Sequence, residues 1–359
     1  MNILFTCAGR RNYLIQYFKK AISGLGNIVA VDSQLSASAL AEADIGIQVP
    51  GIFDPEYISS LQAIIEKYKI SAIIGLNDLE LPILAKNKVK LEKLGARVIV
   101  SDEEFIDICF DKWESYKFFK NLGILTPKTF LTIKDAQNAI NLNQLNYPLI
   151  LKPRWGSASI GVEVVDNETE LLLTYQLLKI KLNKSILKYT CSEDDGKHIL
   201  IQEKIEADEY GMDILNDLNG TYSNSFVRKK LGMRSGETDK AISVINKNFS
   251  DMGKKIGSAT GHIGNMDCDF FVKDDEIYLL EMNPRFGGGY PFSHEAGIDI
   301  PSIYIAWLQG NSNVSQFNNY KANMAFSKCD SIIPLKNSDH NLKEISIITD
   351  HSINAGIRQ

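Results

Sequence analysis

The chain has 359 residues, of which 44% are hydrophobic and 23% charged, and its formal net charge at pH 7 is −5. This length suits two or three domains, and the composition is ordinary for a soluble globular protein. A mildly acidic balance gives no electrostatic reason to bind nucleic acid or an anionic membrane, so we expect neither as a partner.

The five cysteines are scattered along the chain, and none forms a CxxC pair. This pattern suggests neither a zinc site nor a disulfide framework. The apolar run at the N-terminus is too short before Arg10 and Arg11 for a signal peptide, and no stretch is long enough to span a membrane. We therefore expect a cytoplasmic protein.

The first hundred residues alternate between two patterns. Short apolar runs predict buried strands at 3–6, 27–32, 45–49, 71–76 and 96–100. Segments 11–22 and 55–68 have apolar residues at helical spacing. This alternation predicts a Rossmann-like α/β domain at 1–110, with a parallel, doubly wound sheet. Ligands of such sheets lie beyond the carboxyl ends of the strands, here near Gly9–Arg11 and Asn77–Glu80.

The pattern changes from about Asp111. A predicted helix at 112–123 ends at Gly123 and is followed by the breaker Thr126-Pro127. A small central domain at 111–190 is expected, with strands in 146–153 and 162–166, a helix from Glu168, and a charged, irregular excursion at 186–199. The remainder, 191–359, is mostly predicted strand, at 199–205, 210–215, 223–230, 267–275 and 276–283, with one helix at 246–261.

The loop LKPRWGSASIGV (151–162) follows a strand end that carries Lys152. Its small residues would let backbone N–H groups approach phosphate oxygens, and the lysine supplies positive charge. The GK[ST] sequence of a P-loop is missing, and a hairpin loop with a solvated lysine is the alternative. The acidic stretch QEKIEADEYGMDIL (202–215) could orient a purine and a ribose, or simply be solvated surface.

Acidic residues interrupt two apolar strands, MDCDFFV and YLLEMNPRF. A β-hairpin with its turn at 273–275 would place the carboxylates of Asp269 and Glu281 side by side, and Asn283 shares a strand face with Glu281. Three such oxygen ligands suit Mg²⁺ completed by phosphates and water, whereas the alternative is a solvated polar edge. The glycines at 287–289 are expected to let the backbone turn closely around a substrate.

Taken in order, DKW, LKP, the glycine loop, QEKI, the acidic strand and LEMNPRFGGG resemble the ATP-grasp superfamily. The nearest branch is the carbamoyl-phosphate-synthase-like and biotin-carboxylase-like one, and the resemblance covers roughly residues 1–310. It implies a pre-ATP-grasp domain at 1–110, a central lid subdomain at 111–190, and a C-terminal antiparallel-sheet subdomain at 191–359 that ends in a short extension.

The resemblance also implies site residues. Mg²⁺, expected as two ions with Mn²⁺ as a possible substitute, would be held by Asp269, Glu281 and Asn283. Near relatives often carry a longer Glu or Gln where Asp269 stands, which would tighten the geometry. ATP would be held by two lysines, the glycine loop, a hinge and a ribose-binding acid, namely Lys112 and Lys152; Gly156, Ser157, Ser159 and Gly161; Glu203, Lys204 and Ile205; and Glu209.

Three arginines complete the implied site. Arg285 would face the transferred phosphoryl group, and Arg228, Lys230 and Arg234 would hold a substrate carboxylate or stabilise an acyl phosphate. An exposed basic strand at 227–241 is the alternative for the last three residues.

The activity that the resemblance implies is an ATP-dependent carboxylate–amine ligase that forms an amide through an acyl phosphate. An amino acid is expected as one substrate, because the arginines suit carboxylates. A carbamoyl-phosphate-synthase-like enzyme or another carboxylate kinase is an alternative, although enzymes that phosphorylate twice carry two ATP modules. A non-catalytic nucleotide-binding module is disfavoured by the intact charged residues. An NAD-dependent enzyme lacks its glycine fingerprint, so Asp32 is read as structural or substrate-facing. A homodimer built on the N-terminal domain is also expected.

Overall fold

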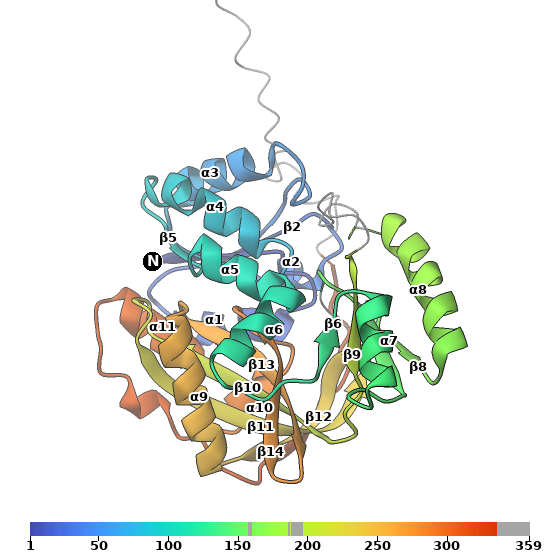
Figure 1. Ribbon diagram of the computed structural model, residues 1–359. Coiled ribbons are helices and arrows are strands. Elements are labelled where there is room, and N and C mark those ends of the chain that lie inside the picture. Colours follow the sequence, from blue (N-terminus) through green and yellow to red (C-terminus); the bar gives the residue numbers. More distant parts are fainter. Residues whose placement is uncertain (157–159, 186, 188–196, 336–359) are drawn as a thin grey trace, which may run out of the picture. The chain divides into compact units, whose positions relative to one another are not determined.

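The structure is a computed structural model that describes residues 1–156, 160–185, 187 and 197–335 (Figure 1). The chain folds as two compact units. The first unit contains Met1–Val100 and Pro301–Ser312, and the second contains Ser101–Ile300 and Asn313–Cys329. The three-part division expected from the sequence stays a prediction. In the described part of the chain, no helix combines the length and the apolar character needed to cross a membrane.

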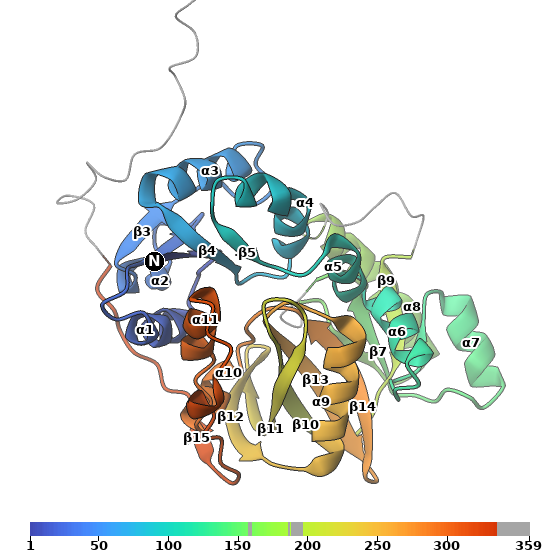
Figure 2. The same cartoon turned by 90° about the vertical axis from the view of Figure 1, so that its left-hand side faces the viewer.

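The first unit is built on a five-stranded parallel sheet with the order β3-β2-β1-β4-β5, which confirms the predicted doubly wound class. Helices cover both faces, with α1 and α11 on one side and α3 and α4 on the other (Figure 2). The elements of the unit are β1 (Asn2–Thr6), α1 (Asn12–Ala21), β2 (Ile28–Asp32), α2 (Ser38–Glu42), β3 (Ile45–Gln48), α3 (Tyr57–Tyr68), β4 (Ile70–Gly75), α4 (Leu81–Glu92), β5 (Arg97–Ile99) and α11 (Ile300–Leu308).

Two acidic residues lie near the carboxyl ends of the strands in this unit. Asp32 accepts hydrogen bonds from the backbone N–H groups of Gly9 and Gln34, both at 2.8 Å, so its carboxylate fastens the turn after β1. Glu80 is fully buried, and the Tyr57 hydroxyl donates to it at 2.5 Å. Burial raises the pKa of Glu80, and this effect exceeds the opposing hydrogen bonds. Both groups therefore serve the local fold.

The second unit contains two antiparallel sheets. The smaller sheet has the order β6-β9-β7-β8, and helices α7 and α8 pack on it. Its elements are β6 (Thr129–Phe130), α7 (Ile133–Asn141), β7 (Leu149–Pro153), β8 (Glu163–Val165), α8 (Glu168–Asn183) and β9 (Ile199–Glu203).

The larger sheet has six strands in the order β14-β13-β10-β11-β12-β15. Its strands are β10 (Asp208–Asn216), β11 (Tyr222–Arg234), β12 (Glu237–Val244), β13 (Asn265–Lys273), β14 (Glu276–Asn283) and β15 (Ala325–Ser327). The other elements of the unit are α5 (Glu103–Phe110), α6 (Lys112–Asn121), α9 (Lys247–Thr260), α10 (Tyr290–Glu295) and the 3₁₀ turn η2 (Ser315–Phe317).

The hydrophobic core of the second unit lies against one face of this larger sheet. Met212, Cys268 and Met282 point into it from three neighbouring strands. They pack with Phe105 of α5 and Phe249 of α9, among other buried side chains. Because side chains alternate along a strand, the residues between these core positions lie on the opposite face.

Candidate active site

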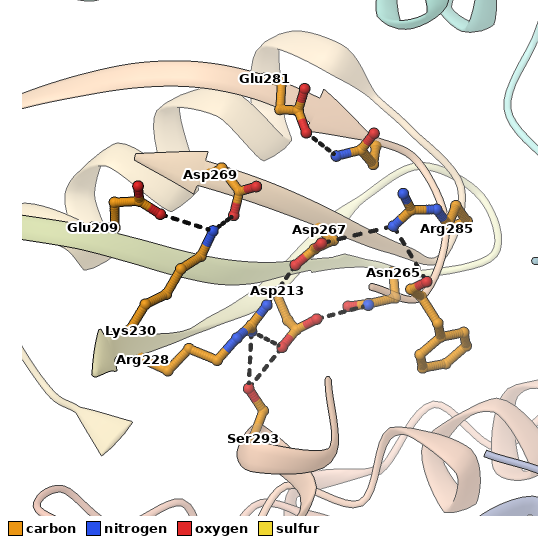
Figure 3. A network of polar contacts seen from close by, with 12 residues as sticks. Glu209, Asp213, Arg228, Lys230, Asn265, Asp267, Asp269, Glu281, Arg285 and Ser293 are labelled. Carbon is orange, nitrogen blue, oxygen red and sulfur yellow. Dashed lines mark hydrogen bonds and ion pairs between the residues drawn. The ribbon is translucent and has the colours of Figure 1, made fainter. Parts of the chain in front are cut away.

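The face of the six-stranded sheet opposite the core carries charged side chains (Figure 3). We call this face, which bears Asp213, Arg228, Lys230, Asp267, Asp269, Glu281 and Asn283, the polar face. The strand register places Asp269 opposite Glu281 and Asp267 opposite Asn283. The predicted hairpin of acidic residues therefore forms, and it brings all three expected metal ligands onto one surface.

Two lysines act on the carboxylate of Glu281, Lys112 through a direct ion pair and Lys152 through its charge. The Lys112 Nζ lies 3.9 Å from Glu281 Oε2 and also donates to the backbone oxygen of Gly156. Lys152 is buried on β7, and burial together with the nearby Lys112 lowers its pKa to about 8, although Glu281 acts in the opposite direction. Two ammonium groups whose charges affect each other provide a favourable position for a polyanion.

Asp111 and Arg154, which the sequence reasoning did not identify, place Lys112. Asp111 caps α6 and accepts from the backbone N–H of Trp113 at 2.9 Å. Arg154, directly after β7, binds the same carboxylate, with Nη2 2.6 Å from Oδ2 and Nε 2.8 Å from Oδ1. This buried pair joins the start of α6 to the end of the strand that carries Lys152. An Asp before a helix is an N-cap signal that could have revealed Asp111.

The carboxylates of Glu281 and Asp269 have different surroundings. Burial alone would raise the pKa of Glu281, but Lys112 and Lys152 lower it, and the net shift is downward. The Asn283 Nδ2 donates to Glu281 Oε1 at 3.3 Å. Burial raises the pKa of Asp269 to about 6, although Lys230 lies with its Nζ 2.7 Å from Asp269 Oδ1.

The donor chemistry of these residues fits a divalent metal ion that also binds phosphate. Two carboxylates and one side-chain amide on neighbouring strands form a hard oxygen set of the kind that Mg²⁺ prefers. Within the described residues, no group of three or more His, Cys, Asp or Glu side chains is arranged to hold a metal ion. An ion bound here would take further oxygens from another molecule, and Asp269 would exchange its contact with the Lys230 ammonium for the ion.

Lys230 also reaches Glu209. Its Nζ lies 3.6 Å from Glu209 Oε2, so one ammonium connects the expected ribose-binding acid with an expected metal ligand (Figure 3). The sequence reasoning had associated Lys230 with a substrate carboxylate. Its described partners are instead the protein's own acidic groups.

The glycine loop and the hinge are described only in part. Gly156 and Gly161 have φ values of 126° and 74°, a backbone region that favours glycine, so both loop ends require this residue type. Ser157 and Ser159 lie outside the described residues. Glu203 ends β9, where its Oε2 accepts from the backbone N–H of Lys128 at 3.1 Å, and Lys204 and Ile205 follow it. The roles expected for these residues stay predictions.

The three expected catalytic arginines occupy different environments. Arg285 follows β14, and its Nη1 lies 3.6 Å from Asp267 Oδ2. Arg234, at the end of β11, is 47% exposed and pairs through Nε with Asp239 Oδ1 at 2.9 Å. Arg228 is only 1% exposed, and its terminal nitrogens bind Asp213 and Asp267 at 2.5 Å each. The structure thus brings Arg285 and Arg228 together around Asp267, which the sequence reasoning did not identify.

Gly287 and Gly289 lie beside buried charged side chains of the protein itself, and the expected close approach to a substrate stays a prediction. Gly289 has φ −86°, which any residue can adopt. A Cβ atom at Gly289 would instead lie 2.3 Å from Arg228 Nε, and one at Gly287 would lie 2.0 Å from Asp267 Oδ2. These two positions need glycine because the buried Arg228 and Asp267 side chains fill the space beside them.

Comparison with known proteins connects this arrangement to a family. A model described as "ATP-grasp domain" matches residues 109–289, and one described as "PylC-like, N-terminal domain" matches residues 3–99. The carbamoyl phosphate synthase large chain of Campylobacter jejuni is 25% identical over 273 residues, which is 72% of this chain and 24% of that relative. The chain therefore spans about a quarter of the length of this relative.

Two solved structures show the same fold at low sequence identity. The biotin carboxylase domain dimer of Hydrogenobacter thermophilus 2-oxoglutarate carboxylase, in complex with MgADP, ADP and bicarbonate, has a TM-score of 0.67 at 19% identity, over 86% of this chain and 70% of that one. The L-amino acid ligase of Bacillus licheniformis also has a TM-score of 0.67, at 16% identity, over 90% of this chain and 78% of that one.

Proposed function

Because the chain belongs to the ATP-grasp family, we propose that it is an ATP-dependent carboxylate–amine ligase that forms an amide through an acyl phosphate. The observation that carries this proposal is the 3.9 Å contact of the Lys112 ammonium with the carboxylate of Glu281. The buried Lys152 adds a second positive charge that lowers the pKa of the same carboxylate. Phosphoryl transfer needs cationic groups for the phosphate oxygens next to carboxylates for a divalent ion. The second unit supplies both, with the lysines on α6 and β7 and the carboxylates on the polar face.

ATP would bind across the second unit. Lys112 and Lys152 would hold the α- and β-phosphates, and the glycine loop at 156–161 would cover the triphosphate. The hinge formed by Glu203, Lys204 and Ile205 would bind adenine mainly through its backbone. The Glu203 carboxylate already accepts a hydrogen bond from the backbone of Lys128. Glu209 would bind the ribose after Lys230 moves away from this carboxylate, or while Lys230 still contacts it.

Mg²⁺ would be held by Asp269, Glu281 and Asn283, and we propose two ions, with Mn²⁺ as a possible substitute. When bound, the ions would offset the negative charge on the phosphoryl oxygens. Arg285 would contact the transferred phosphoryl group, and Arg234 would approach the substrate from the turn between β11 and β12. The protein's contribution would be positioning and fixed charge rather than a covalent step of its own.

An amino acid is the proposed substrate on at least one side of the amide. The L-amino acid ligase with the same fold supports this class, as does the arginine content around the polar face. A homodimer is proposed because the solved biotin carboxylase domain is described as a dimer. A cytoplasmic location is proposed from the scattered cysteines of the sequence.

A second candidate is a carboxylate kinase of the carbamoyl-phosphate-synthase type. It is supported by the 25% identity to a carbamoyl phosphate synthase large chain. The two candidates differ in what they require: the kinase would release phosphate with bicarbonate and without an amino-acid acceptor, whereas the ligase needs an acid and an amine together.

A screen for phosphate release tests the proposal. The purified chain is incubated with Mg-ATP and pairs of amino acids, and both phosphate and amide product are measured. We expect phosphate, ADP and an amide with at least one pair. Lys152→Ala should lower the affinity for ATP roughly 10- to 100-fold, as expected for loss of a charge-assisted contact. The control Lys247→Ala removes an exposed lysine paired with Asp251 on α9 and should leave the affinity unchanged.

Two outcomes would contradict the proposal. Unchanged ATP affinity in Lys152→Ala would remove the assigned phosphate contact. Phosphate release with bicarbonate alone, and with no amino-acid pair, would favour the carboxylate kinase.

A further inference from the structure

Arg228 lies within a buried ion cluster on the polar face, which we define as Asp213, Arg228, Asp267 and Arg285 (Figure 3). The guanidinium of Arg228 joins two carboxylates, with Nη1 2.5 Å from Asp213 Oδ2 and Nη2 2.5 Å from Asp267 Oδ1. Formally, the cluster has two positive and two negative groups. Removal of any member would therefore leave an uncompensated charge in a buried position.

The far end of the cluster is firmly held. Asp213 accepts from Ser293 Oγ at 2.6 Å and from Asn265 Nδ2 at 3.0 Å. Asp213 is thus fixed by residues of α10 and β13, and it fixes Arg228 in turn. Because Asp213 is held in place, it keeps the Arg228 guanidinium oriented toward Asp267.

Three glycines form the walls around the guanidinium and its partner. A Cβ atom at Gly211 would lie 2.9 Å from Arg228 Nη2, one at Gly289 would lie 2.3 Å from Arg228 Nε, and one at Gly287 would lie 2.0 Å from Asp267 Oδ2. The backbone therefore encloses this pair from both β10 and the segment after β14. A side chain packed this closely has few alternative rotamers.

Asp267 is the member that connects the cluster to the proposed reaction. Its Oδ1 binds the fixed Arg228, and its Oδ2 lies 3.6 Å from the Nη1 of Arg285. The second distance is that of a charge contact rather than a short hydrogen bond. The same Nη1 donates to the backbone oxygen of Phe286 at 3.3 Å, so Asp267 and this carbonyl together orient the guanidinium of Arg285.

We propose that Arg228 and Asp267 are positioning residues that orient Arg285 toward the phosphoryl group. This inference rests on the proposed function, which places Arg285 at that group. In this interpretation, Gly287 and Gly289 are required because only glycine leaves room for the Arg228–Asp267 pair. Stability alone explains the cluster poorly, because a buried ion pair is often no more stabilising than packed apolar residues of similar volume.

The test compares two nucleotides that differ at the γ-phosphate. Calorimetric titration gives the dissociation constants of MgADP and of Mg-AMP-PNP, a non-hydrolysable ATP analogue. The ratio of the MgADP constant to the Mg-AMP-PNP constant reports the contacts to the γ-phosphate. Arg285→Ala should reduce this ratio by roughly 10-fold or more, as expected for a charge-assisted contact. Asp267→Asn, which keeps the size of the side chain, should reduce it by roughly 3- to 10-fold while the MgADP affinity stays unchanged.

The double variant and a matched control separate positioning from structure. Asp267→Asn combined with Arg285→Ala should show no further loss beyond Arg285→Ala alone, because the two residues act as one unit. Asp213→Asn weakens the hold on the far end of the same guanidinium, so it should lower the unfolding midpoint and reduce the ratio less than Asp267→Asn does. A purely structural role of Asp267 would weaken the binding of both nucleotides equally.

Each failure has a separate meaning. If Arg285→Ala keeps the wild-type ratio, the role of Arg285 in the proposed function is wrong. If Arg285→Ala lowers the ratio but Asp267→Asn does not, the proposed function stands and the positioning role is overturned. The same holds if the double variant lowers the ratio by the product of the two single effects.

Discussion

Glu80 in the first unit and Asp267 in the second are both buried carboxyl groups, but their partners differ. Glu80 is held by a neutral donor, the Tyr57 hydroxyl, and burial raises its pKa. Burial acts on Asp267 in the same direction, but Arg228 and Arg285 overcome it and lower the pKa of this group. A buried acid without a cation thus favours the neutral form, whereas one placed between two guanidinium groups stays ionised.

The opposite pKa shifts distinguish a carboxyl group that stabilises local packing, Glu80, from one that belongs to a charged site, Asp267. Glu80 completes the packing of the first unit below the carboxyl ends of β1 and β4. Asp267 keeps a fixed negative charge beside residues expected to meet phosphate. The contrast can be tested in each unit by a change that affects one of the two environments.

The largest expected effect concerns the space around Arg228. Gly289→Ala should lower the free energy of unfolding by about 1–3 kcal/mol, because the new methyl group would lie 2.3 Å from Arg228 Nε in an enclosed position. Gly288→Ala is the matched control. Its nearest atoms, at 3.1 Å, belong to the partly exposed carboxylate of Glu237, which can move. Urea unfolding of both variants measures the difference, and equal costs would show that the Arg228–Asp267 pair does not set the glycine requirement.

A smaller effect is expected at Glu80, and it depends on pH. The folded chain keeps a proton on this group that the unfolded chain releases above its ordinary pKa of about 4.3. The stability contribution is therefore fully present below that value, and it is lost as pH rises toward the raised pKa of the folded state. Glu80→Gln removes the ionisation, so we expect it to flatten this part of the pH profile and to raise the free energy of unfolding at pH 8 by roughly 1 kcal/mol.

Urea unfolding at pH 5 and pH 8 checks the prediction for Glu80. Glu66→Gln, at an exposed position of α3, serves as the control and should leave the slope unchanged. A Glu80→Gln profile as steep as that of the wild type would mean that another group carries the pH dependence.

Much of the fold could be predicted from local patterns. All five strands of the first sheet were expected, because short apolar runs alternate there with helical spacing. The strands β9, β10, β11, β13 and β14 and the helix α9 were also expected within a few residues. Sequence reasoning missed β12 and β15, which form the outer part of the six-stranded sheet. The polar sequence of β12 and the shortness of β15 give little periodicity, so their place depends on pairing with distant segments.

The candidate site was predictable only in part. The shared face of Asp269, Glu281 and Asn283 could be predicted because acids interrupt apolar strands, and the ladder register confirms it, while their role as metal ligands stays a prediction. Asp267 could not be distinguished from its neighbour Asp269, since its partners Arg228 and Arg285 come from elsewhere in the chain. The glycine tract was noticed, but its physical reason is tertiary: the space that Arg228 and Asp267 occupy is not visible in the sequence.

The most direct measurement of the central claim is the effect of Mg²⁺ on ATP binding to the second unit's polar face in the full chain. Calorimetric titrations with AMP-PNP are made in excess Mg²⁺ and after removal of the ion with EDTA, for the wild type, Glu281→Gln and Glu276→Gln. Glu276 is an exposed residue at the other end of β14 and serves as the control.

We expect Mg²⁺ to raise the affinity of the wild type and of Glu276→Gln on the order of 10-fold or more, and Glu281→Gln to lose most of this gain. A Mg²⁺ effect that persists in Glu281→Gln, or an affinity that is the same with and without the ion in the wild type, would contradict the assignment of the polar face as a Mg-ATP site.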